Sequence, residues 1–128
     1  MTKLRIGDLE QVGTCNLTIV TGKTLKNWPV FLINGVWGLT PLPKSYTHKV
    51  DMEWEWLSVT HLSTGYRAGD VRVDDPRKKQ KLAKYAQMFG GTRTFDGVMR
   101  KYRKLSKRRQ LWIKQQNAWL LPSKVVKP

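Results

Sequence analysis

The chain has 128 residues, of which 40% are hydrophobic and 26% charged, a composition typical of a single folded globular domain. One cysteine excludes an internal disulfide framework and favours a reducing compartment, and the formal net charge of +15 favours a polyanionic partner over a cationic one. The N-terminal residues lack the apolar segment of a signal peptide, and no apolar run could span a membrane. We therefore expect a cytoplasmic protein without a membrane segment.

The positive charge is confined to the second part of the chain. Residues 1–75 contain eight basic and eight acidic residues, whereas residues 76–128 contain sixteen basic residues and one acidic residue, Asp96. Repulsion at that density destabilises a folded state unless a polyanion offsets it. We predict one domain with a neutral β-rich part (1–75), a basic helical part (76–121) and a tail (122–128), and nucleic acid or a nucleoprotein complex as its partner.

The chain opens with two segments that favour β-strands. These are Leu4–Val12 and Leu17–Thr21, both rich in β-branched and aliphatic residues. Between them, the small and polar residues of Gly13–Asn16 are typical of a connection in a hairpin. We therefore predict a turn over Gly13–Asn16.

A second hairpin has the strongest local signal. Val30–Ile33 and Val36–Leu39 flank Asn34 and Gly35. Both central residues tolerate the positive φ that a type I′ turn requires, so this pair predicts a two-residue turn. Pro41 lacks an amide hydrogen, and we expect it to end the strand.

Further strands follow a predicted loop at Lys44–Asp51. Glu53–Trp56 alternates with a period of two, which places its tryptophans on one sheet face. Leu57–Leu62 continues as a strand, Ser63–Gly65 is typical of a tight turn, and Tyr66–Val73 returns antiparallel. The absence of crossover helices predicts an antiparallel meander of five to six strands, an arrangement that can also curl into a partial barrel.

A first helix follows the strands. Asp74 or Asp75 is a suitable N-cap with Pro76 at the first helical position, and Gly90 with Gly91 is a suitable end. The helical spacing of its apolar residues predicts the following buried stripe: Leu82, Tyr85, Ala86 and Phe89.

A second helix is predicted over residues 95–120, capped by Thr92 or Thr94, which gives an α+β fold with two basic C-terminal helices. Arg109 falls on its apolar stripe, so either the helix breaks near Ser106-Lys107 or Arg109 pairs with a sheet carboxylate such as Glu53 or Glu55. The predicted stripe consists of Phe95, Val98, Met99, Tyr102, Leu105, Ile113 and Leu120.

Cationic side chains project away from both stripes, where they can contact several phosphates. The aromatic residues Tyr85, Tyr102 and Trp112 have core spacing, whereas Trp119 lies at the stripe edge and could stack on a base. The predicted nucleic-acid-binding residues are Lys81, Lys84, Arg100, Lys101, Arg103, Lys104, Lys107, Arg108, Lys114 and Trp119.

An enzymatic site would have to use His48, His61, Asp51, Glu53 and Glu55, which could bind a divalent metal for phosphodiester hydrolysis. Their spacing matches no ligand pattern that we recognise, and His61 alternates inward with aliphatic residues as a packed strand histidine does. Cys15 has no activating neighbour. We therefore predict no catalytic residue, no metal site and no cofactor.

The segment from Trp56 to Gly69, followed by a basic helix, resembles small proteins of phages or mobile elements, although no motif in it identifies a family. The first hypothesis is a non-catalytic accessory protein that binds nucleic acid, either DNA or RNA. The second is an interaction protein or inhibitor, for example phage-encoded and anti-CRISPR-like, that occupies a site of a nucleic-acid-processing complex. A metal-dependent nuclease ranks third.

Overall fold

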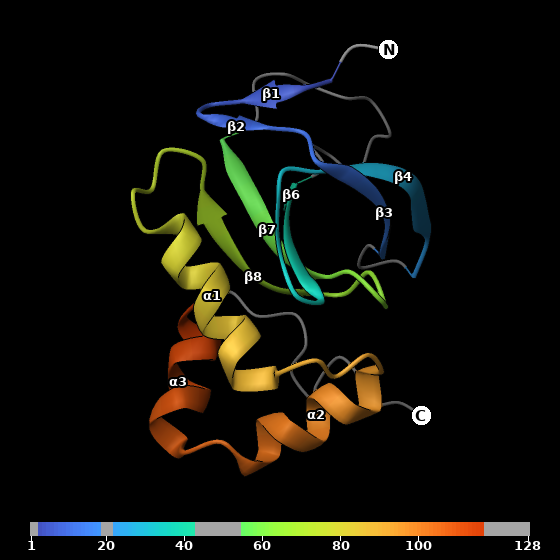
Figure 1. Cartoon of the computed structure of the whole chain (residues 1–128). Coiled ribbons are helices and arrows are strands. Elements are labelled where there is room, and N and C mark those ends of the chain that lie inside the picture. The colour runs from blue at the N-terminus through green and yellow to red at the C-terminus, as the bar shows by residue number, and fades with distance from the viewer. Residues whose placement is uncertain (1–2, 19–21, 43–54, 117–128) are drawn as a thin grey trace.

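The computed structural model describes residues 3–18, 22–42 and 55–116. Within these segments it has eight strands, all paired antiparallel, followed by three helices (Figure 1). This order confirms the predicted α+β class. The described strands form three separate sheets that do not close into a barrel, whereas the sequence predicted one meander of five to six strands.

The first reversal of the chain lies earlier than predicted. Strands β1 (Arg5–Ile6) and β2 (Leu9–Glu10) pair across a turn at Gly7, which has a φ of +56°. The predicted turn at Gly13–Asn16 is wrong, because these residues belong to strand β3 (Gly13–Thr18). A glycine can adopt a positive φ without steric cost, so the reversal occurs within the segment that was predicted as one strand.

Strand β3 pairs with β4 (Thr24–Val30), which the sequence did not predict. Pro29 in this strand cannot donate to a ladder. Among the described strands β4 has one hydrogen-bonded neighbour, so a proline can be accommodated at its other side. Asn27 has a φ of +58°, and the pairing with β3 is irregular at this point, between Cys15 and Leu17.

The third sheet has four strands in chain order, and it carries the helices. Two of its strands are β5 (Leu32–Asn34) and β6 (Trp37–Pro41), and the other two are β7 (Trp56–His61) and β8 (Arg67–Arg72). The predicted loop over residues 44–51 lies outside the described segments. Residues 53 and 54 of the predicted alternating segment also lie outside them.

Both predicted hairpins of this sheet are present. Asn34 pairs with Trp37, and Gly35 has a φ of +63°, so the turn residues are 35 and 36 rather than 34 and 35. Glycine at the first central position is the requirement of a type II′ turn, not of the predicted type I′. The β7–β8 turn ends at Gly65, with a φ of +80°, and a Cβ there would collide with the carbonyl of Asn16.

Helix α1 (Lys78–Phe89) covers one face of this sheet (Figure 1). Trp37 on β6 is fully buried and lies 5.6 Å from Tyr85 and 5.5 Å from Phe89, measured between ring centroids. These contacts place the predicted stripe of the first helix in the core. Aromatic pairs at such distances add to the free energy of burial.

The start of α1 departs slightly from the prediction. The regular helix begins at Lys78, not at Pro76, yet the carboxylate of Asp75 accepts a hydrogen bond from the Arg77 amide at 2.7 Å. Asp75 therefore stabilises the turn that leads into the helix, but the N-cap residue is Arg77, without a side-chain capping bond, so the predicted N-cap at Asp74 or Asp75 is wrong. The helix ends before Gly90, whose φ is +58°, which confirms the predicted end.

The predicted second helix is two helices, α2 (Phe95–Lys104) and α3 (Lys107–Gln115). Leu105 and Ser106 between them have extended backbones, so the chain breaks at the predicted position. Both helices are capped, because Thr94 accepts from the Gly97 amide at 3.0 Å and Ser106 accepts from the Arg109 amide at 3.2 Å. None of the described helices is long and apolar enough to cross a membrane.

Candidate nucleic-acid interface

Helix α2 presents four cations because its opposite face is held in the core. Val98, Met99 and Tyr102 are buried, and they recur at the three- and four-residue spacing of one helix face. The side chains on the other faces must therefore point to solvent. The exposed cationic residues of α2 are Arg100, Lys101, Arg103 and Lys104.

Helix α3 continues this exposed surface after the break. Ile113 is its buried residue and holds the helix to the core, while Lys107, Arg108 and Lys114 are exposed. The side-chain amide of Gln110 donates to the Tyr102 carbonyl at 3.0 Å and to the Leu105 carbonyl at 3.1 Å. These bonds satisfy carbonyls at the end of α2, so the angle between the two helices is set by hydrogen bonds as well as by packing.

The break also decides the position of Arg109. On one continuous helix this residue would lie on the buried stripe, and a carboxylate partner such as Glu55 would be needed. In the structure Arg109 is exposed on α3, and Glu55 is exposed on the sheet. The two extended residues before α3 change the helical phase, so Arg109 is exposed to solvent and needs no partner in the core.

Three of the four lysines of α1 have side-chain contacts within the protein. Lys81 lies 2.8 Å from a carboxylate oxygen of Asp75, and the ammonium of Lys84 lies 4.3 Å above the ring of Trp112. Lys78 is 7% exposed and lies 2.9 Å from the carboxylate of Asp8. Lys81 and Lys84, which the sequence assigned to the interface, thus serve internal contacts on a helix that packs on the sheet.

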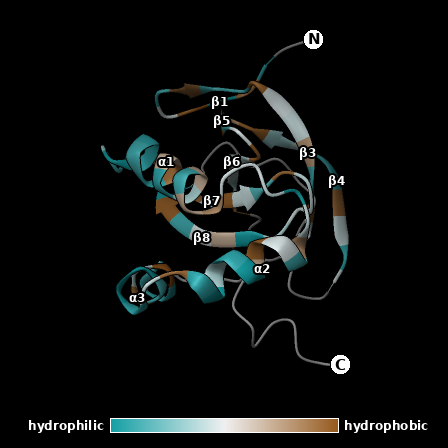
Figure 2. Cartoon of the chain, turned by 60° about the horizontal axis from the view of Figure 1, so that its bottom comes forward, coloured by the Kyte–Doolittle hydropathy of each residue, from teal (hydrophilic) through white to brown (hydrophobic). Residues whose placement is uncertain are grey.

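Seven cations of α2 and α3 differ from these lysines. All seven were predicted to belong to the interface, and their side chains make no ion pair, hydrogen bond or ring contact with any residue that the structure describes. Figure 2 shows α2 and α3 from the side on which they come forward, with largely hydrophilic ribbons. The seven residues, called the α2–α3 basic face below, are Arg100, Lys101, Arg103, Lys104, Lys107, Arg108 and Lys114.

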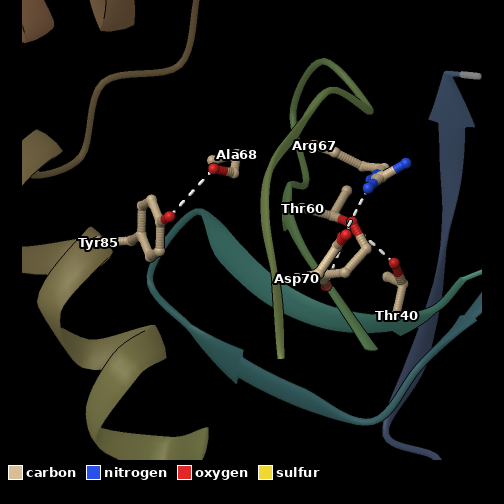
Figure 3. A network of polar contacts seen from close by, with 7 residues as sticks. Thr40, Thr60, Arg67, Ala68, Asp70 and Tyr85 are labelled. Carbon is tan, nitrogen blue, oxygen red and sulfur yellow. Dashed lines mark hydrogen bonds and ion pairs between the residues drawn. The ribbon is translucent and has the colours of Figure 1, made fainter. Parts of the chain in front are cut away.

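The aromatic residues near these helices are mostly structural, as predicted. Tyr85 and Tyr102 are buried, and Trp112 is partly buried against Tyr85 at a centroid distance of 5.2 Å. The Tyr85 hydroxyl donates to the Ala68 carbonyl at 3.0 Å (Figure 3), and burial raises the pKa of this phenol. Trp119, the predicted stacking residue, lies outside the described segments.

His61 joins the sheet to the segment between α1 and α2. It is fully buried, and its Nε2 donates to the Thr92 carbonyl at 2.7 Å, which leaves Nδ1 to accept from the Thr64 hydroxyl at 2.8 Å. Burial lowers the pKa of this imidazole. Both ring nitrogens are engaged, so the prediction of a packed strand histidine is confirmed.

The second face of the four-stranded sheet contains a buried polar network (Figure 3). The hydroxyls of Thr40 and Thr60 lie 2.7 Å apart, and Arg67 donates to the carboxylate of Asp70 at 2.6 Å. Burial raises the pKa of Asp70, while the neighbouring Arg67 opposes that shift. The bond between Thr40 and Thr60 joins β6 to β7, whereas the ion pair of Arg67 with Asp70 lies within β8.

The residues described by the structure contain no group of three histidine, cysteine, aspartate or glutamate side chains that could hold a metal ion. Of the five residues considered for catalysis, His48, Asp51 and Glu53 lie outside the described segments. His61 is buried and Glu55 is exposed. Burial raises the pKa of the Cys15 thiol to about 11, which keeps it protonated and unreactive at neutral pH.

Sequence reasoning missed two neighbours of the basic face. Thr92 and Gly97 line an open hollow together with Arg100, Lys101 and Lys104. The spacing of Gly97 relative to the three cations, which puts all four on one helix face, was a signal in the sequence. The approach of Thr92 was not, because it depends on how the segment between α1 and α2 folds.

No protein-family model matches this chain, and no curated protein or solved structure is significantly similar to it.

Proposed function

We propose that this protein is a non-catalytic nucleic-acid-binding accessory protein, and that the α2–α3 basic face contacts phosphates. The contacts are electrostatic and depend little on base sequence. The partner is nucleic acid or a nucleoprotein complex in the cytoplasm, and Trp119 is expected to add a stacking contact.

One observation carries the proposal. Seven exposed cations on two consecutive helices have no counter-charge among the described residues, and Asp96 is the one acidic residue among residues 76–128. Lysine and arginine on a surface usually alternate with acids, which reduces their mutual repulsion. A phosphate backbone supplies the missing negative charge, and its neutralisation releases counterions, which adds to affinity.

The shape of the surface supports the same conclusion. The bonds of Gln110 hold α2 and α3 at a defined angle, so the cations form a fixed array. Arginine has a planar fork that matches two phosphate oxygens. The face carries three arginines and four lysines, a mixture suited to a backbone and not to the reading of base edges.

The test is a variant in which Arg100, Arg103, Lys104, Lys107 and Arg108 are replaced by glutamine. Helix propensity is nearly unchanged, because glutamine is close to lysine and arginine on that scale. Affinity for a generic duplex or RNA should fall by roughly an order of magnitude or more at physiological salt, and the dependence of affinity on salt should become shallower. The melting temperature should stay constant or rise, since repulsion between the helices decreases.

Two results would overturn the proposal. The first is an affinity of the intact protein that stays flat between about 50 and 200 mM salt, because phosphate neutralisation requires a steep fall. The second is a glutamine variant that unfolds while its remaining folded molecules bind normally, which would make the basic face a structural element.

A protein partner is the second candidate, and Leu111 is the observation that favours it. This side chain is 54% exposed on α3, between Arg108 and Lys114. An apolar residue among cations suits an acidic protein surface, so an inhibitor of a nucleic-acid-processing complex could use the same face. Tight binding to a protein, with no binding to any free nucleic acid, would select this candidate.

A further inference from the structure

The α2–α3 basic face contains one concave place. An open hollow of about 320 Å³ is lined by Thr92, Gly97, Arg100, Lys101 and Lys104. Three of its five lining residues are cations, and none is acidic. The volume corresponds to roughly ten water molecules, at about 30 Å³ each in the liquid, which is enough for a phosphate group and part of its sugar.

The helical spacing explains why the cations meet. Residues 97, 100, 101 and 104 are three, four and seven positions apart, so they share one face of α2. That face is turned away from the buried side chains of Val98, Met99 and Tyr102. Arg100 and Lys104 are four residues apart, and like charges at this spacing destabilise a helix. An anion between them would remove that repulsion.

Gly97 and Thr92 form the uncharged part of the lining. A Cβ on Gly97 would lie 2.5 Å from Cγ2 of Thr92, so only glycine lets the two segments approach this closely. Thr92 is itself held in place, because its carbonyl accepts from His61 at 2.7 Å and its hydroxyl donates to the Phe89 carbonyl at 2.7 Å. This part of the lining is therefore held by bonds within the protein and does not depend on a ligand.

The backbone and the threonine hydroxyl are not available to bind an anion. The Gly97 amide already donates to Thr94, and the Thr92 hydroxyl already donates to Phe89. The binding groups must be the three cations. The ammonium of Lys101 also lies near the carboxyl end of α1, 3.0 Å from the position that a Cβ on Gly90 would occupy.

We infer that this hollow is a built phosphate site, in which Arg100, Lys101 and Lys104 hold one phosphodiester group of the bound nucleic acid. The inference rests on the proposed function and goes beyond it, because it divides the seven cations into two classes. The three around the hollow make a defined contact that fixes the position of the backbone. The other four cations contribute by charge alone, without a defined contact, and they are Arg103, Lys107, Arg108 and Lys114.

The test compares two triple variants that remove identical side chains. The hollow variant is Arg100→Gln, Lys101→Gln and Lys104→Gln, and the control variant is Lys107→Gln, Arg108→Gln and Lys114→Gln. Each removes one arginine and two lysines from exposed helix positions. The affinity of each variant for a short RNA and a DNA of the same sequence is measured at several salt concentrations. The hollow variant should lose at least about tenfold more affinity than the control.

A second measurement uses the unchanged protein, so it does not depend on the folding of a variant. Inorganic phosphate is titrated into isotope-labelled protein, and the NMR shifts of the Thr92 and Gly97 amides are followed. These shifts should saturate with phosphate in the wild type and in the control variant, and should be absent in the hollow variant. Sulfate should compete with phosphate, whereas chloride at equal ionic strength should not.

The outcomes separate the inference from the proposed function. Equal losses in both variants, with no saturable phosphate shifts, overturn the hollow site and leave the proposed function intact. Failure of the wild-type protein to bind any nucleic acid overturns the proposed function, and the phosphate titration then decides the hollow by itself. Saturable binding of an acidic peptide with no effect of phosphate would overturn the hollow site in favour of a protein ligand.

Discussion

Helix α1 and the pair α2–α3 are both rich in lysine and arginine, but they use these residues differently. In α1, Lys78 and Lys81 pair with aspartates and Lys84 lies over a tryptophan ring. In α2 and α3, seven cations have no such contact among the described residues. A cationic helix is therefore not in itself an interface, and the informative property is the charge that the rest of the fold leaves uncompensated.

The difference follows from where the acidic residues lie. Asp8 is in the turn between β1 and β2, and Asp75 precedes α1. Both are close to the first helix because α1 packs directly on the sheet. The β-rich part is electrically neutral, so its own basic residues balance its carboxylates and it has no excess of negative charge for the later helices. Helices α2 and α3 lie farther along the chain, and their exposed cations meet no acidic partner among the residues that the structure describes.

The largest effect that would sharpen this comparison is a loss of packing on α3. Ile113 is 1% exposed, so Ile113→Ala should lower the free energy of unfolding by roughly 2–5 kcal/mol. Lys114→Gln, at the next residue, should change it little, because an exposed charge contributes little to folding. Leu105 is only partly buried at the break, so Leu105→Ala should cost less than Ile113→Ala. Urea denaturation measures all three values.

If Lys114→Gln destabilised the protein as strongly as Ile113→Ala, the α3 cations would be part of the folded core. The division between internal and external charges would then be wrong.

An intermediate effect on the free energy of unfolding is expected from acidification, because it protonates His61 in the unfolded chain before the folded one. Burial lowers the pKa of this histidine in the folded state, while the unfolded chain keeps a value of about 6.5. Below that pH the unfolded state binds the proton more readily, so stability is complete above about pH 6.5 and falls as the pH decreases toward the folded pKa. The slope contributed by one such group is at most about 1.4 kcal/mol per pH unit.

The measurement is urea denaturation of the wild type and of His61→Gln between about pH 8 and pH 5, with the unfolded-state pKa of about 6.5 inside that range. The variant should be less stable at high pH but should lose less stability on acidification. A wild-type pH dependence that survives unchanged in the variant would rule out His61 as its source. Because His61 holds Thr92, phosphate shifts at Thr92 should weaken in this variant while the charges of α2 are retained.

The smallest effect tests α1 directly. Lys84→Gln removes the contact with Trp112, and exposed contacts of this kind contribute about 0.5–1 kcal/mol. The free energy of unfolding should fall by that amount, while the affinity for nucleic acid should change less than in Arg108→Gln. Equal losses of affinity in the two variants would bring α1 into the interface and remove the contrast between the helices.

Features with local causes could be predicted from the sequence. The cap at Thr94, the end of α1 at Gly90, and the break before Lys107 all depend on residues within one or two turns. The turn ending at Gly65 has the same origin. The charge asymmetry was equally visible, since it is a property of composition. These signals fixed the α+β class and the helices that carry the cations.

One local signal was misread, and one strand was not predicted. Gly7 lies inside an apparently continuous strand, and β4 was not among the strands predicted from the sequence. A glycine permits a positive φ without requiring it, and a proline such as Pro29 is acceptable in a strand that has an edge.

Only the tertiary structure could decide which cations have partners within the protein and which remain without one among the described residues. The ammonium of Lys78 meets Asp8, seventy positions earlier, and the approach of Thr92 to α2 depends on the buried bond from His61. Such contacts are set by how the sheet and helices pack, and no spacing rule along the chain encodes them. The sequence determined how much positive charge the helices carry, and packing determined where that charge is left uncompensated, because a charge is neutralised by whatever lies next to it in space.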